Sequence, residues 1–208
     1  VPVAETAPLR PISPYGASKM MTEQMLADAA VAHPLRYCAL RYFNVAGADP
    51  AGRSGQASRQ ATHLIKVACE VVTGRRGPLD VFGTDYPTRD GTCVRDYIHV
   101  GDLVHAHWQA LQFLRHGGDS IVLNCGYGQG YSVLDVIDTV KRVSGIDFEV
   151  RMAERRAGDS AELVAGTALI HETLSWRPQF EDLNLIVDHA LNWERKLQAH
   201  LRAEPAFP

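Results

Sequence analysis

The feature that most constrains the fold is the alternation of short strand-like runs with helix-like segments along the chain. Short strand-like runs occupy residues 37–43, 79–82, 121–124 and 148–152, and the runs at 37–43 and 121–124 are apolar except for one residue each. Runs this short, rich in β-branched and aromatic residues, indicate buried strands. Because strands alternate with helices along the chain, the sequence predicts an α/β architecture.

Capping signals mark where helices begin and end. Ser13 followed by Pro14 is typical of an N-cap and first helical position, which predicts a helix to about residue 32. Ser132 and Asp135 resemble a capping box that opens a helix ending at Gly145. The remaining expected helices and long polar loops are, in order, a loop at 48–58, a helix at 62–73, a loop at 84–95, and helices at 99–114, 167–177 and 183–197.

Composition excludes several classes of partner. The 208 residues carry a net charge of −3, which argues against nucleic acid because phosphate backbones attract basic stripes. No apolar run approaches the roughly 20 residues that a membrane helix needs, so we expect no membrane partner. The four cysteines are at least 24 residues apart, which argues against a metal site or a disulfide framework and favours a cytoplasmic protein with reduced thiols.

The sharpest local feature is the spacing of Tyr15 and Lys19. Residues four apart share one face of a helix. A lysine ammonium beside a phenol stabilises the phenolate, which makes tyrosine usable as a general acid or base near neutral pH. Spacing alone is more often explained by two surface residues that share a face by chance, so the pair gains meaning only from its surroundings.

Three ordered motifs supply those surroundings. The runs PISPYGASK, LRYFNVAGADP and FGTDYPTRDGTCVRDYIHVGDL resemble the extended short-chain dehydrogenase/reductases, and the third resembles UDP-glucose 4-epimerases in particular. The resemblance covers residues 2–193 and implies part of a Rossmann-like parallel sheet plus a smaller α/β domain. We therefore expect an NAD-binding remnant at 1–45 and 96–125, and a UDP-sugar-binding domain at 46–95 and 126–208.

The resemblance also implies a role for each matched residue. Tyr15 would take the proton from the sugar 4-hydroxyl while hydride passes to NAD and then returns to the opposite face of a 4-keto sugar. Lys19 would hold the nicotinamide ribose beside Tyr15, and Tyr42 would lie near the nicotinamide. The expected UDP-sugar ligands are Asn44 for the substrate, Leu64 and Phe82 for the uridine, Arg95 and Arg156 for the diphosphate, and Asp159 for a ribose hydroxyl.

Two residues differ from the family pattern, and one glycine-rich run resembles a dinucleotide-binding turn without matching it. His63 stands where the family often has Asn, and a histidine ring can still donate a hydrogen bond. Leu163 stands beside the expected sugar pocket where other members carry Tyr or a small residue, which leaves activity on N-acetylated sugars open. The glycine-rich run 126–130 lacks the spacing of a dinucleotide-binding turn, so we interpret it as a strand-to-helix turn.

Two parts of the family pattern are missing, namely the glycine-rich turn that cradles NAD and the catalytic Ser or Thr that precedes the Tyr. We therefore expect the C-terminal portion of a longer UDP-glucose/UDP-galactose 4-epimerase, inactive by itself. The alternatives are a 4-epimerase for a UDP-pentose or UDP-uronic acid, and a non-catalytic nucleotide-sugar-binding fragment. A homodimer is expected through a helix face that includes Met20, Met21, Met25 and Ala29.

Overall fold

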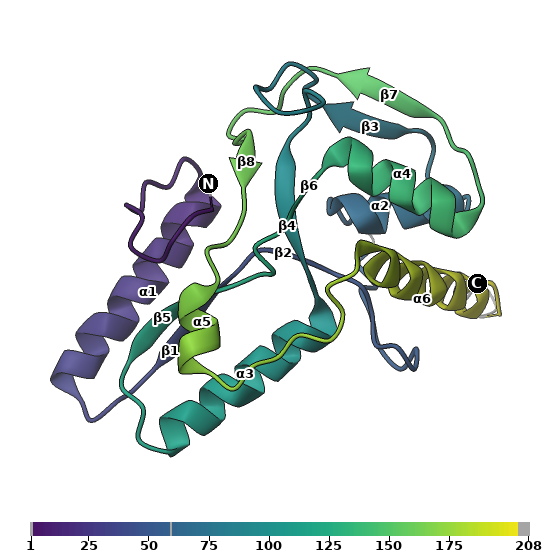
Figure 1. The fold of residues 1–208 in the computed structure, drawn as a ribbon. Helices are drawn as coiled ribbons and strands as arrows, with labels where there is room; N and C mark the ends of the chain where they lie inside the picture. Colours follow the sequence, from purple (N-terminus) through teal and green to yellow (C-terminus); the bar gives the residue numbers. More distant parts are fainter. Residues whose placement is uncertain (1, 59, 204–208) are drawn as a thin grey trace, which may run out of the picture.

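The structure is a computed structural model, and it describes residues 2–58 and 60–203 (Figure 1). The helices are α1 (Pro14–Ala32), α2 (Leu64–Val72), α3 (Val100–Arg115), α4 (Val133–Ser144), α5 (Ala168–Thr173) and α6 (Leu183–Ala203). The strands are β1 (Cys38–Tyr42), β2 (Asn44–Ala46), β3 (Leu79–Phe82), β4 (Val94–His99), β5 (Ile121–Cys125), β6 (Gly130–Ser132), β7 (Val150–Ala153) and β8 (Glu162–Leu163).

Parallel strand pairs dominate the three small sheets. β1 pairs with β5, β2 pairs with β4, and β3 pairs with β7, all in parallel. β4 also takes β8 as a parallel neighbour and β6 as an antiparallel one. Helices connect the paired strands, so the α/β prediction is confirmed.

Two hydrophobic cores lie on either side of strand β4, which contributes Tyr97 to one of them and Ile98 to the other (Figure 1). One core joins α3, β5 and α5. Its largest fully buried side chains are those of Trp176, Ile98, Leu123 and Ile170. The other core joins α2, α4 and α6 beneath β3, around residues such as Val136. β4 therefore lies between the two cores and packs against both.

Most predicted helix boundaries agree with the structure. Ser13 caps α1, and its Oγ accepts the Gly16 N–H at 3.1 Å. Ser132 and Asp135 form the predicted reciprocal capping box at the start of α4. The segment 167–177 is a shorter helix than expected, because α5 ends at Thr173 and the chain then extends.

The strand predictions need three corrections. The expected strand at 37–43 is present as β1, but a second strand, β2, follows it directly, because the chain changes sheets at Phe43 so that β1 pairs with β5 and β2 with β4. The expected loop 84–95 ends early, since β4 begins at Val94 despite its polar residues Arg95 and Asp96. The short strands β6 and β8 were not predicted, because two or three residues carry no readable periodicity. No described helix is long and apolar enough to cross a lipid bilayer.

Candidate functional site

Tyr15 and Lys19 lie on one exposed face of the first turns of α1. The Ser13 cap and Pro14 fix the start of the helix directly before Tyr15. The Lys19 ammonium lies 5.2 Å from the centroid of the Tyr15 ring, and 69% of Tyr15 is accessible. The phenol is therefore next to a positive charge and open to a ligand.

Both side chains line a cavity of about 810 Å³, which we call the Tyr15 cavity. Tyr42, at the end of β1, and Asn44, at the start of β2, form another part of its wall, and Leu163 of β8 also lines it. A cavity of this size accommodates an organic ligand rather than a few waters. The three predicted cofactor residues therefore face one common space.

A second cavity of about 710 Å³, the Arg95 cavity, brings two arginines to one carboxylate. Arg156 Nε lies 3.1 Å from one oxygen of Asp159, and Arg95 Nη2 lies 3.9 Å from the other. The Arg156 guanidinium also lies 4.7 Å from the centroid of the Phe82 ring, and Leu64 lines the same wall. Guanidinium groups in such a cluster suit phosphate oxygens, and the apolar wall suits a flat base.

Asn44 and His63 line both cavities, so the two spaces share a wall. His63 is the residue before α2 and Asn44 begins β2, and these two segments lie between the Tyr15 and Arg95 sides of the site. The structure thus brings together all ten predicted site residues, although they span residues 15–159 of the chain. One extended ligand could contact an acid/base group at one end and the arginines at the other.

Asp96, which sequence reasoning left without a role, fixes the strand that carries Arg95. Its buried carboxylate accepts the backbone N–H groups of Tyr127 at 3.0 Å, Gly128 at 2.9 Å and Ala165 at 3.2 Å. Burial raises the pKa of Asp96, and these hydrogen bonds oppose the rise. Because the N–H groups of Tyr127 and Gly128 in this turn donate to the Asp96 carboxylate, they are not available to bind a phosphate.

Sequence reasoning also missed polar residues in the cavity walls. Arg41 and Glu23 line the Tyr15 cavity, where Arg41 Nε lies 2.9 Å from Glu23 Oε2. Arg76 and Cys93 line the Arg95 cavity. The signal for Arg41 was a single charge inside an otherwise apolar strand, which demands a partner. Within residues 2–58 and 60–203, no three His, Cys, Asp or Glu side chains are grouped to hold a metal ion.

The parallel strand pairs, the connecting helices and the joined cavities define a Rossmann-like α/β protein with a candidate site for an extended ligand. Residues 1–126 match the sequence model of the NAD dependent epimerase/dehydratase family. The chain therefore belongs to that family.

Individual relatives are similar over almost the whole chain. A UDP-glucose 4-epimerase of Azospirillum brasilense is 60% identical over 198 residues, which are 95% of this chain and 57% of that protein. A UDP-glucose-4-epimerase structure from Stenotrophomonas maltophila, with bound NAD and formylated UDP-arabinopyranose, is 41% identical with a TM-score of 0.91, over 96% of this chain and 60% of that one. The UDP-Glc/GlcNAc 4-epimerase of Campylobacter jejuni is 50% identical with a TM-score of 0.77, over 94% and 59%. The chain thus spans about three-fifths of the length of these relatives.

Proposed function

We propose that the whole protein is a UDP-glucose 4-epimerase that interconverts UDP-glucose and UDP-galactose with NAD as its cofactor. The observation that carries this proposal is the shared wall of the two cavities. It puts the Tyr15 phenol and the Arg95–Arg156 cluster on one continuous lining, as a sugar joined to a diphosphate requires. Relatives at up to 60% identity that are UDP-glucose 4-epimerases support it.

The residues of the Tyr15 cavity fit the nicotinamide end of the cofactor. Tyr15 and Tyr42 are both about half exposed or more, at 69% and 49%, and Lys19 offers an ammonium for ribose hydroxyls. When bound, NAD would supply the acceptance and return of a hydride. Tyr15, Lys19 and Tyr42 would hold and orient its nicotinamide and ribose.

Tyr15 acts as the general base on the sugar. Its phenolate oxygen takes the proton of the 4-hydroxyl and later returns it, and the Lys19 ammonium stabilises the phenolate that exists before the first transfer and after the second. Asn44 lies on the wall common to both cavities, where an amide can donate to a sugar hydroxyl or accept from one. His63 lies on the same wall and is the second candidate ligand for the substrate.

The Arg95 cavity binds the UDP portion. Arg95 and Arg156 contact the diphosphate, because two guanidinium forks can each form paired charge-assisted hydrogen bonds with phosphate oxygens. Asp159 accepts a hydrogen bond from a ribose hydroxyl. Leu64 and Phe82 provide an apolar wall for the uracil ring.

The two cores support a division into an NAD-binding part, 1–45 and 96–125, and a UDP-sugar-binding part, 46–95 and 126–208. The helix α5 belongs to the second part by sequence, yet it packs in the first core beside β5. It therefore ties the two parts together.

A homodimer forms through α1. All residues of this helix are described and none is buried, and Met21 and Met25 are 59% and 63% exposed. Met20 and Ala29 flank them. A face of this kind favours a partner helix. The four cysteines, all within the described residues, are free, which supports a cytoplasmic location.

A coupled assay of the whole protein tests the function. UDP-galactose and NAD are supplied, and UDP-glucose formation is measured beside parallel reactions with UDP-pentoses, UDP-uronic acids and N-acetylated UDP-sugars. We expect the largest kcat/KM for the UDP-glucose/UDP-galactose pair. A larger value for a UDP-pentose would reassign the substrate, and binding of UDP without turnover of any sugar would contradict the enzymatic role.

A further inference from the structure

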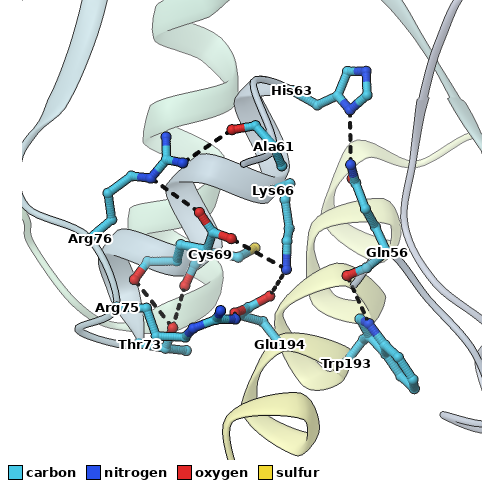
Figure 2. Close-up of polar contacts among 11 residues, drawn as sticks. Gln56, Ala61, His63, Lys66, Cys69, Thr73, Arg75, Arg76, Trp193 and Glu194 are labelled. Carbon is cyan, nitrogen blue, oxygen red and sulfur yellow. Dashed lines mark hydrogen bonds and ion pairs between the residues drawn. The ribbon is translucent and has the colours of Figure 1, made fainter. Parts of the chain in front are cut away.

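We propose that Gln56 is a positioning residue that sets the tautomer of His63, so that the ring nitrogen Nε2 carries the hydrogen and donates a hydrogen bond to the bound substrate. The inference deepens the proposed function and rests on it for the identity of the ligand. The contact that motivates it joins Nε2 of the Gln56 amide and Nδ1 of His63 at 3.0 Å (Figure 2).

The amide nitrogen determines which proton the ring carries. An amide NH₂ group can only donate, so Nδ1 of His63 must be the acceptor in this contact. In a neutral imidazole the other nitrogen then bears the hydrogen. Nε2–H is thereby available as a donor on the wall that both cavities share.

The position of Gln56 is itself fixed from α6. The Trp193 indole N–H donates to the backbone carbonyl of Gln56 at 3.1 Å, and Figure 2 shows this bond and the His63 contact as a chain from α6 to α2. Gly55 makes the approach possible, since a Cβ there would lie 2.4 Å from the indole Cγ. Lys196 Nζ also donates to the Gly52 carbonyl at 2.6 Å, which holds the same loop to α6.

This arrangement explains how a histidine can serve at the site. A histidine without a fixed partner exchanges between two tautomers, and only one of them offers a donor at a given nitrogen. Gln56 removes that ambiguity for His63. The structure therefore assigns to Gln56 an influence on substrate affinity although it contacts the substrate only through His63.

The test compares Gln56→Glu with Gln60→Glu in the whole protein. The carboxylate at position 56 only accepts, so the His63 ring should carry its proton on Nδ1, whereas Gln60 is an exposed residue of the same loop and adds the same charge. The two ring nitrogens are observed by NMR after ¹⁵N-histidine labelling, and the His63 signals are assigned by their loss in His63→Asn. KM and kcat for UDP-galactose are measured on the same variants.

We expect the Nε2–H tautomer in the wild type and in Gln60→Glu, and Nδ1 protonation in Gln56→Glu. KM should rise about 5- to 15-fold in Gln56→Glu with kcat little changed, the cost of about one lost hydrogen bond. An Nδ1–H tautomer in the wild type, or a tautomer unaffected by Gln56→Glu, would overturn the assignment to Gln56. A changed tautomer with an unchanged KM would overturn the donation by His63 to substrate, and an inactive wild type would instead contradict the proposed function.

Discussion

Lys66 on α2 and Glu194 on α6 form a buried ion pair between positions 128 apart in the sequence (Figure 2). The two side chains are only 7% and 0% exposed. Arg75 Nη1 lies 2.5 Å from the other oxygen of Glu194, and Glu70 lies 3.5 Å from the Lys66 ammonium. The group attaches α6 to the helix that begins directly after His63.

Removing the charge of Glu194 should destabilise the protein strongly. In Glu194→Gln, the buried Lys66 ammonium loses its nearest anion, and the more exposed Arg75 loses the same partner, which costs about 3–5 kcal/mol. Urea unfolding measures the loss. The control is Glu149→Gln, whose carboxylate pairs with Arg151 at an exposed position and should change the unfolding midpoint little. Equal shifts in the two variants would contradict the importance of the buried pair.

Gly55→Ala should also destabilise the protein, by about 1–3 kcal/mol, because the new methyl group would overlap the Trp193 indole. Gly77→Ala provides a matched comparison, since a Cβ there meets no described atom within 4 Å. This second variant should be neutral or slightly stabilising through the unfolded chain. Thermal unfolding of both variants checks the prediction, which fails if the two midpoints move together.

The alternation of strands and helices could be predicted because each segment carries its own periodicity or cap, as Ser13 and Ser132 show. The start of β4 could not be predicted, because Arg95 and Asp96 are polar residues. The hydrogen bonds that allow Asp96 to be buried come from backbone groups far away in the sequence. Asp96 is a buried residue only because the N–H groups of Tyr127 and Ala165 reach it. Such long-range pairing leaves no local pattern in the sequence.

The candidate site shows the same division. The residues from Tyr15 to Asp159 could be named through a family resemblance, and the structure then brought them to adjoining cavities. Gln56, however, belongs to a loop of polar and small residues with no motif of its own. Its contact with His63 depends on Trp193, which is 137 positions away. Roles that arise from such contacts become visible only in three dimensions.

Stability should fall with acid because of His99, which is fully buried and faces His189, Asp102 and Phe180. Burial, with the charge of His189 adding to it, lowers the pKa of His99 from 6.5 to about 4. The unfolded chain therefore takes up this proton first as the pH falls. The contribution of neutral His99 is complete above pH 6.5 and decreases through the window down to about 4.

Below the upper end of that window, the free energy of unfolding should drop by about 1.4 kcal/mol per pH unit on account of this one group. Urea unfolding at a series of pH values measures the slope. In His99→Asn, which keeps a side chain suited to cap α3, the slope should be shallower even though the protein is less stable at neutral pH. An unchanged slope would show that other groups control the acid response.

Arg156→Lys should weaken UDP binding by about 10- to 100-fold, because a lysine loses the paired hydrogen bonds of a guanidinium to phosphate. Calorimetry with UDP and the whole protein gives the affinity. Arg151→Lys on β7, where the guanidinium pairs with Glu149, is the control and should bind UDP as the wild type does. Wild-type affinity in Arg156→Lys would remove Arg156 from the diphosphate site.

In the proposed reaction, Tyr15 transfers the proton of the sugar 4-hydroxyl. The most direct measurement is the turnover of UDP-galactose by the whole protein carrying Tyr15→Phe, together with its affinity for UDP. Loss of the hydroxyl should lower kcat by at least about 100-fold and leave the affinity for UDP unchanged, since the Arg95 cavity is intact. Turnover at the wild-type rate in Tyr15→Phe would contradict the account.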